Sequence, residues 1–359
     1  MSTLFDEVTF AHGSSMRNRF MLAPLTNQQS HADGTLSDDE YRWLTMRAQG
    51  GFGLTMTCAS HVDARGQGFR GQLGCFGDEH VPGLQRLAEG LNAAGTLSVV
   101  QLHHAGRRSP SELIGSAPVA PFDDEATGAT AFTTDDIASL IESFIAAAIR
   151  AETAGFGGVE IHGAHDYVIC EFLNAESNQR TDGYGGTLEN RARIIFDIAK
   201  GIRARTSPQF HLALRLSPEG FGMQTREITE VYQMAVDSRF FDMIDMSLWS
   251  VFKEANDPDF AGQRLIDIFA NLPRGDVRLA VAGHLYRAED MRACLDAGAD
   301  IVALGRAAIT NHNLPELVRQ NPDFSMRELP VSRATLRDEG LGTTFVEYMS
   351  GWKGFVEEE

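Results

Sequence analysis

The chain has 359 residues, with 43% hydrophobic and 22% charged residues and a formal net charge of -18. These values suit a globular protein that buries its own core, but the acidic balance disfavours nucleic acid and anionic membranes as partners, because both require concentrated Lys and Arg. The start of the chain carries acids where a signal peptide needs basic and then apolar residues, and no stretch approaches the roughly 18 apolar residues of a membrane span, so we expect a cytoplasmic protein.

Short apolar runs alternate with amphipathic stretches along the whole chain. The apolar runs are residues 20–23, 54–57, 96–102, 158–161, 210–216, 243–246, 277–282 and 301–304. Helical patterns lie between them, for example at residues 135–154, 189–205 and 288–297. Eight strands separated by helices predict one α/β domain over residues 1–359, a (β/α)8 TIM barrel. We expect the tail from about residue 330 to cover the barrel or to form a subunit contact in a possible homo-oligomer.

An open doubly wound sheet is the alternative, because residues 66–71 match the dinucleotide-binding fingerprint G-x-G-x-x-G. That fingerprint needs a tight turn from a strand into a helix. Here several residues separate it from the preceding apolar run, and residues 72–82 do not read as a helix. We therefore interpret residues 66–71 as a loop, and residues 115–132, which are rich in Pro, Ala and Thr, as a second long loop.

Residue types that suit metal or Schiff-base chemistry are sparse. The cysteines are Cys58, Cys75, Cys170 and Cys294, and no two of them form a Cys-x-x-Cys pair. Zinc, iron–sulfur and thioredoxin-like sites therefore lose support, and we expect reduced core cysteines and no metal. Lysines occur only at positions 200, 253 and 353, which weakens any mechanism that needs a lysine nucleophile.

Polar motifs follow the apolar runs, and in a barrel the carboxyl ends of the strands form the active site. Residues 23–26 read Ala-Pro-Leu-Thr, residues 101–107 read Gln-Leu-His-His-Ala-Gly-Arg, and residues 305–306 read Gly-Arg. The densest cluster follows the fourth run: residues 162–167 read His-Gly-Ala-His-Asp-Tyr, and further motif residues continue to position 191. We expect these motifs to converge at one end of the barrel.

The cluster closely resembles the Old Yellow Enzyme family, and the resemblance extends from about residue 18 to about residue 315. It is carried by His-x-x-His-x-Tyr followed by Asn-x-Arg-Thr-Asp-x-Tyr-Gly-Gly-x-x-Glu-Asn-Arg, with the Gln101 and Gly305-Arg306 motifs in family order. The resemblance implies FMN as cofactor, NADPH or NADH as reductant, and reduction of activated C=C bonds in enones, enals, unsaturated esters and nitroalkenes. The cofactor-binding residues that it implies are Pro24, Leu25, Thr26, Ala59, Gln101, His162, Arg215, Ala282, Gly283, Gly305 and Arg306.

These residue types suit the flavin roles that the resemblance implies. Gly305 and Arg306 offer backbone N–H groups and a guanidinium to a phosphate. Gln101 can both donate to and accept from the pyrimidine edge of a flavin, and Thr26 can donate near its O4 atom. Arg215 can stabilise negative charge on the reduced ring.

The implied catalytic residues are His162, His165 and Tyr167. The two histidines can donate N–H groups to one carbonyl or nitro oxygen of the substrate, and Tyr167 is implied as the proton donor to carbon. The expected substrate pocket consists of Gln28, His103 and Trp249. Asp166 stands where relatives usually carry Gly, and we expect it to point outward. Arg180 and Asp182 are interpreted as a structural pair that pins a loop.

Three other functions remain open. His103, His162 and His165, with Glu160 or Asp245, could hold the metal of a barrel hydrolase. Some relatives carry an iron–sulfur cluster and an extra dinucleotide-binding region for dienoyl-thioester reduction, but this chain lacks the cysteines and ends shortly after the barrel. A non-redox lyase or isomerase could use the phosphate site for its substrate.

Overall fold

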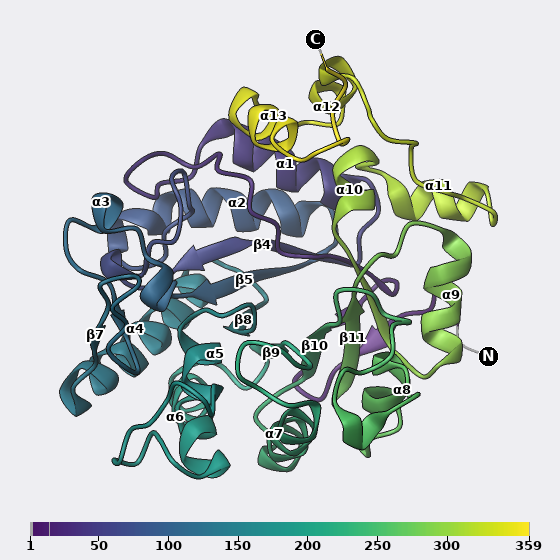
Figure 1. The fold of residues 1–359 in the computed structure, drawn as a ribbon. Helices are drawn as coiled ribbons and strands as arrows, with labels where there is room; N and C mark the ends of the chain where they lie inside the picture. The colour runs from purple at the N-terminus through teal and green to yellow at the C-terminus, as the bar shows by residue number, and fades with distance from the viewer. Residues whose placement is uncertain (1–2, 14, 359) are drawn as a thin grey trace.

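The computed structural model describes residues 3–13 and 15–358, and its centre is a closed barrel of parallel strands (Figure 1). Around the barrel the strands follow the order β10-β11-β12-β3-β4-β5-β8-β9. Their bounds are β3 (Phe20–Leu22), β4 (Leu54–His61), β5 (Leu97–His103), β8 (Gly158–Gly163), β9 (His211–Leu216), β10 (Met243–Ser247), β11 (Arg278–Ala282) and β12 (Ile301–Leu304). Because β12 pairs with β3, the sheet has no edge, and the TIM barrel prediction is confirmed while the open sheet is wrong.

Helices surround the barrel (Figure 1). They are α1 (Asp38–Gln49), α2 (Val81–Ala93), α4 (Thr134–Thr153), α6 (Leu188–Arg205), α7 (Thr225–Ser238), α8 (Leu265–Ala270), α9 (Ala288–Asp296), α10 (Arg306–Thr310) and α11 (Leu314–Gln320), with the short α3 (Ser111–Ile114) and α5 (Val168–Leu173) in loops. In α4, Ile137, Leu140 and Phe144 lie on one buried face, and Thr133 and Asp136 cap the first turn reciprocally. The helices predicted at 135–154, 189–205 and 288–297 are therefore confirmed.

Alternate strand positions fill the inside of the barrel, and their polarity changes along its axis. At the amino ends of the strands the interior is apolar, with Met21, Leu54, Met56, Leu97, Val99, Ala213, Met243, Ala280 and Ile301 in one cluster. The hairpin of β1 (Val8–Thr9) and β2 (Ser15–Met16) adds Val8 and Met16 to this cluster and closes that end. Further along, the same alternation places Gln101, His103, Glu160, His162, Arg215 and Asp245 inside. This polar layer forms the floor of the site described below.

Two loops that the sequence predicted are present as loops. Residues 66–71 follow β4 without starting a helix, and Gly71 adopts φ 65 beside the carbonyl of Gln28, where a Cβ atom would have no room. Residues 115–132 contain only the short strands β6 (Val119–Ala120) and β7 (Thr130–Ala131). Arg180 pins this second loop, because it donates to the carbonyl of Phe132 at 2.7 Å and pairs with Asp182 at 2.5 Å, which confirms the predicted structural pair.

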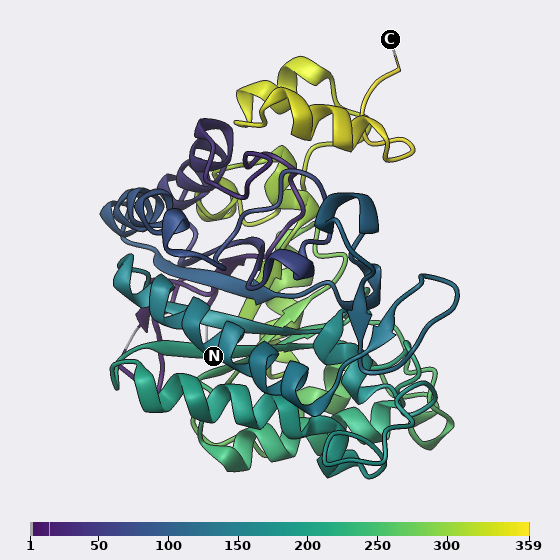
Figure 2. The ribbon, with the colours of Figure 1, turned by 90° about the vertical axis from the view of Figure 1, so that its left-hand side faces the viewer.

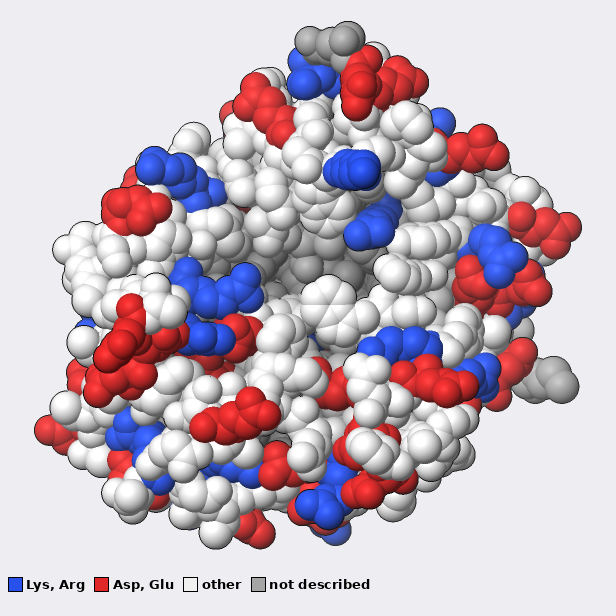
Figure 3. All heavy atoms as spheres, viewed as in Figure 1, with Lys and Arg blue, Asp and Glu red and all other residues white. Residues whose placement is uncertain are grey.

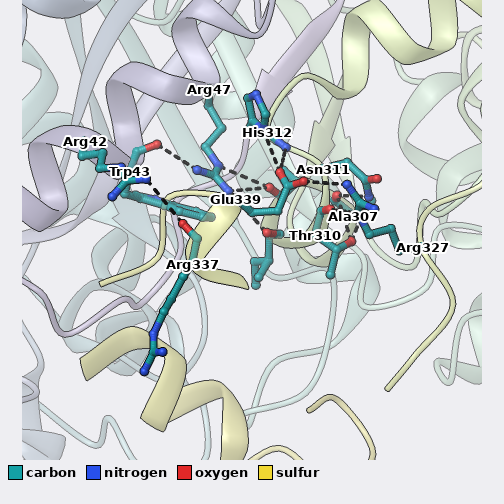
Figure 4. A network of polar contacts seen from close by, with 12 residues as sticks. Arg42, Trp43, Arg47, Ala307, Thr310, Asn311, His312, Arg327, Arg337 and Glu339 are labelled. Atoms are coloured by element: carbon teal, nitrogen blue, oxygen red, sulfur yellow. Dashed lines mark hydrogen bonds and ion pairs between the residues drawn. The ribbon is translucent and has the colours of Figure 1, made fainter. Parts of the chain in front are cut away.

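The tail from residue 330 folds back onto the barrel through α12 (Arg333–Asp338) and α13 (Thr343–Ser350), which lie beside α1 and α10 (Figures 1 and 2). Trp43 of α1 packs edge-on against Phe345 of α13, with ring centroids 4.9 Å apart. Buried Glu339 accepts hydrogen bonds from the His312 backbone N–H at 2.6 Å and from Arg327 at 2.8 Å (Figure 4). The tail is therefore clamped to the segment that follows α10.

Candidate active site

A cavity of about 620 Å³ opens at the carboxyl ends of the strands, within the roughly 300–1,000 Å³ typical of ligand and cofactor sites. Figure 3 shows the molecule hollowed near the middle of this face, with basic side chains at the rim. The predicted residues that line the cavity are Pro24, Leu25, Thr26, His165, Tyr167, Arg215, Trp249, Ala282, Gly283, Gly305 and Arg306. The motifs at the ends of six strands thus meet at one site, as expected from the barrel topology.

The cavity is basic although the protein is acidic. Arg108, Arg215 and Arg306 line it, and none of its lining residues is Asp or Glu. Arg306 is held at the rim by Tyr286, whose hydroxyl accepts from the guanidinium at 3.2 Å, and by the indole of Trp352, 5.1 Å from the guanidinium carbon. The site can therefore attract an anionic group against a net charge of -18.

The lining fits a phosphorylated flavin. Gly283 adopts φ 148, and a Cβ atom there would lie 2.7 Å from the backbone carbon of Trp249, so only glycine lets the loops after β10 and β11 approach this closely. Gly305 leaves bare backbone next to the guanidinium of Arg306, at the end of β12. Pro24 and Leu25 supply an apolar wall on the neighbouring strand end. A planar ring can lie along this wall with its phosphate at Arg306.

Buried charged groups form the floor of the cavity. Gln101 donates its side-chain N–H to Glu160 at 2.7 Å, and the Nε atom of Arg215 lies 3.1 Å from the Oδ2 atom of Asp245. The strand register places these groups together, because Gln101 pairs with Glu160 and Arg215 pairs with Asp245. Burial raises the pKa of Glu160 to about 8, the charge of Asp245 adds to this effect, and burial also raises the pKa of Asp245. At neutral pH Glu160 therefore carries a proton.

Three histidines and a tyrosine pack together above this floor. The ring of Tyr167 lies 4.3 Å from His103 and 5.2 Å from His162, and His162 lies 5.2 Å from His165, measured between ring centroids. Burial, together with the positive charge of Arg215, lowers the pKa of His165 to about 3 and holds the pKa of His162 well below its ordinary value. Both imidazoles are therefore neutral at physiological pH.

Hydrogen bonds to the two neutral histidines limit which ring nitrogen of each can donate to a ligand. The backbone N–H of Ala164 donates to the Nδ1 atom of His162 at 3.3 Å, so the His162 proton lies on Nε2. The Nε2 atom of His165 lies 2.7 Å from the hydroxyl of Ser247, which leaves its Nδ1 atom for another partner. His162 can thus present its Nε2–H group, and His165 can present an Nδ1–H group when the Ser247 hydroxyl donates to its Nε2 atom.

The turn that carries His165 and Asp166 has an uncommon backbone conformation. His165 and Asp166 adopt φ values of 63 and 61, which are rare for residues other than glycine. Three side chains hold the turn: Ser217 accepts from the His165 N–H at 3.1 Å, Arg108 donates to the His165 carbonyl at 2.8 Å, and Arg107 pairs with Asp166 at 2.5 Å. The Asp166 carboxylate therefore binds Arg107 and does not line the cavity, in agreement with its expected direction.

Five predicted residues are not part of the cavity lining. Ala59 and Gln101 pair with each other in the sheet, and His103 and His162 lie against Tyr167. Gln28 has a left-handed backbone with φ 59 and packs its carbonyl against Gly71, and its expected pocket role stays a prediction. His103 is fully buried, and its Nδ1 atom lies 3.0 Å from the Nε2 atom of Gln72, which places it behind the cavity wall.

Several lining residues were missed by the sequence analysis: Arg108, Phe221, Ser247, His284 and Tyr286. Ser247 follows Asp245 at the strand period of two, and this signal could have found it. Arg108 directly follows the motif at residues 101–107, and nothing in the sequence distinguishes it from Arg107. Phe221 comes from the loop after β9, for which the sequence pattern holds no signal.

The geometry gives the metal-dependent hydrolase no support. Within residues 3–13 and 15–358, no group of three or more His, Cys, Asp or Glu side chains is placed to hold a metal ion. All four cysteines are buried as expected, and burial raises the pKa of each thiol. In the same described ranges, no helix is both long and apolar enough to cross a membrane.

Comparison with known proteins decides the family. The sequence model of the NADH:flavin oxidoreductase / NADH oxidase family matches residues 3–323. The chain belongs to this family. A probable NADH-dependent flavin oxidoreductase of Bacillus subtilis, YqiG, is 32% identical over 327 residues, which cover 88% of each chain. An NADPH dehydrogenase of Bacillus pumilus is 33% identical over 316 residues, 85% of this chain and 90% of the relative.

Solved structures agree with the family assignment. An Old Yellow Enzyme homologue from Zymomonas mobilis has a TM-score of 0.81 and 27% sequence identity, over 97% of this chain and 99% of that one. The protein is therefore an FMN-dependent NAD(P)H oxidoreductase of the Old Yellow Enzyme type. This confirms the predicted family, the cofactor FMN and a nicotinamide reductant.

Proposed function

We propose that this flavin oxidoreductase reduces C=C bonds activated by a carbonyl or nitro group, with His162 and His165 binding the activating oxygen and Tyr167 protonating the α-carbon. Arg306, Gly283 and Gly305 would hold FMN, and the bound flavin would provide the hydride for the β-carbon. The observation that carries the proposal is a chain of ring contacts: His162 packs against both His165 and Tyr167, and His165 and Tyr167 line the cavity that fits a flavin.

The histidines suit an electrophilic role because they are neutral donors. A neutral imidazole N–H polarises the substrate oxygen and stabilises the negative charge that develops there, without itself being the acid that protonates carbon. Burial and Arg215 keep His165 neutral, and the Nδ1 atom of His162 is already occupied by the Ala164 N–H. The proton must therefore come from another group.

Tyr167 suits that task because it remains protonated. Burial raises its pKa above the ordinary value of a phenol, so the hydroxyl keeps its proton at physiological pH. Its ring is held edge-on by His103 and His162 and lines the same cavity as His165. A phenol fixed next to the oxygen-binding pair can deliver a proton to the carbon adjacent to the polarised group.

The test is Tyr167→Phe, which keeps the ring and removes the proton. We expect reoxidation of the reduced enzyme by cyclohexenone to slow by roughly 10²- to 10⁴-fold, the range for a positioned general acid. Reduction of the enzyme by NAD(P)H should change little, and reduction of a quinone should survive because a quinone accepts hydride on oxygen. Stopped-flow absorbance separates the two half-reactions.

Tyr286→Phe is the matched control, because Tyr286 lines the same cavity but contacts Arg306. At saturating FMN it should leave cyclohexenone reoxidation within a few fold of wild type. If cyclohexenone reoxidised the Tyr167→Phe variant at the wild-type rate, the proton would have to come from water or from another residue. The role proposed for Tyr167 would then have to be abandoned.

A further inference from the structure

Arg108 places an unneutralised positive charge beside the proposed proton donor. It is exposed at the cavity wall, and its guanidinium carbon lies 4.8 Å from the centre of the Tyr167 ring. One terminal nitrogen donates to the His165 carbonyl at 2.8 Å, which fixes the side chain over the active-site turn. Among the described residues, no other hydrogen bond or ion pair engages this guanidinium, so its remaining N–H groups are available for a ligand.

The neighbouring arginine has the opposite environment. Arg107 pairs with Asp166 at 2.5 Å and Asp124 at 3.0 Å, and lies 3.7 Å from Glu171. Among the residues that the structure describes, none of these carboxylates forms an ion pair with Arg108. Asp166, the acid in the active-site turn, thus pairs with Arg107, and its charge does not neutralise Arg108.

The other two arginines of the cavity are already accounted for. Arg215 lies on the floor, with its Nε atom 3.1 Å from Asp245. Arg306 stands at the phosphate end beside Tyr286 and Trp352. Since no Asp or Glu lines the cavity, the substrate end keeps the net positive charge of Arg108 after FMN has bound.

We propose that Arg108 selects substrates with a carboxylate: activated alkenes whose carbonyl or nitro oxygen binds His162 and His165 and whose separate carboxylate binds the free edge of the guanidinium. A guanidinium matches a carboxylate in charge and in geometry. The inference rests on the proposed function and deepens it. The reaction is unchanged: NAD(P)H is oxidised, hydride reaches the β-carbon, Tyr167 protonates the α-carbon, and the carboxylate leaves as it entered.

The experiment compares a matched pair of probes with the holoenzyme: 3-oxocyclohex-1-enecarboxylate and its neutral carboxamide. The readout is the ratio of their kcat/KM values, in which the general reactivity of each variant cancels. We expect the wild-type enzyme to favour the carboxylate, and Arg108→Gln to lower the ratio about 10- to 100-fold, as expected for loss of a charge-assisted hydrogen bond. Arg108→Lys should restore part of the preference.

Two further measurements guard against a general electrostatic or structural effect. Lys353→Gln removes a positive charge near Arg306 and Trp352 but outside the active-site turn, and should leave the ratio unchanged. Binding of the saturated analogue 3-oxocyclohexanecarboxylate, titrated through the flavin absorbance, should weaken in Arg108→Gln by a similar factor without any turnover.

The outcomes separate two failures. If wild type reduces both probes and Arg108→Gln leaves the ratio and the analogue affinity unchanged, the inference about Arg108 is overturned while the proposed function stands. A raised KM for NADPH alone, with NADH and the probe ratio unaffected, would assign Arg108 to the reductant's phosphate and also overturn it. If NAD(P)H reduces the flavin but neither probe nor cyclohexenone reoxidises it, the proposed function itself fails.

Discussion

Glu160→Gln should stabilise the protein, and the gain should grow as the pH rises from 5 to 8. The buried carboxyl of Glu160 has a pKa raised to about 8 by burial and by Asp245, from an ordinary value of 4.5. Between these values the unfolded chain loses the proton while the folded chain keeps it, so the folded state of the wild type loses stability as the pH increases. Glutamine keeps the acceptor for Gln101 and has no proton to lose.

The magnitude follows from the two pKa values. Each pH unit between them costs the wild type up to about 1.4 kcal/mol from this one group. From pH 5.5 to pH 7.5 the free energy of unfolding of Glu160→Gln should therefore rise by roughly 2.5 kcal/mol relative to wild type. Above pH 8 the difference should level off, because Glu160 is then ionised in both states.

Urea denaturation of the holoenzyme, followed by tryptophan fluorescence at pH 5.5, 6.5, 7.5 and 8.5, measures this difference. FMN affinity must be determined for each protein, because a bound ligand adds its own stabilisation. Glu112→Gln is the control: Glu112 is exposed in α3, and its pH profile should parallel wild type. Parallel profiles for wild type and Glu160→Gln between pH 5.5 and 7.5 would refute the argument that the folded protein keeps Glu160 protonated.

Other parts of the molecule give three further expectations. Arg306→Ala should weaken FMN binding by roughly 1.5 to 3 kcal/mol through loss of a charge-assisted contact, measured by titration of refolded apoprotein; unchanged affinity would place the phosphate elsewhere. The double substitution of His162 and His165 by Ala should leave flavin reduction by NAD(P)H measurable and slow reoxidation by cyclohexenone in stopped flow, and an unaffected second step would make the pair structural. Glu339→Gln should lower thermal stability by about 1.5 to 3 kcal/mol, since the carboxylate that accepts from His312 and Arg327 is lost; an unchanged Tm would show that this clamp contributes little.

The barrel was predictable because its strands are buried on both faces and therefore read as short apolar runs. The end of β4 was not. The run at 54–57 predicted four residues, whereas β4 continues to His61 past a bulge between Met56 and Ala59. At the bulge the hydroxyl of Thr57 accepts from the backbone N–H of Gln101, where a regular strand pair would use a backbone carbonyl. No periodic sequence pattern predicts this side-chain contact.

The site was predictable where a contiguous motif carries it. Residues 162–167 project from one turn, so their spacing places His165 and Tyr167 at the same cavity. The left-handed backbone of Gln28 was not predictable, because it is uncommon for glutamine and has no local sequence signal. Trp352 reaches Arg306 only because the tail folds back. Among the described residues, Arg108 has no carboxylate partner because Arg107 pairs with the nearby acids, so both features depend on tertiary packing.

The acidic exterior around a basic cavity also affects how fast NAD(P)H associates with the enzyme. A net charge of -18 repels the anionic reductant at long range, while Arg108 attracts it only at the mouth of the cavity. Salt shortens the reach of both fields, to about 8 Å at physiological ionic strength. The diffuse repulsion acts over the longer distance and is screened first. We therefore expect moderate salt to speed the approach of NAD(P)H to this enzyme, the reverse of its effect where the whole surface steers a ligand inward.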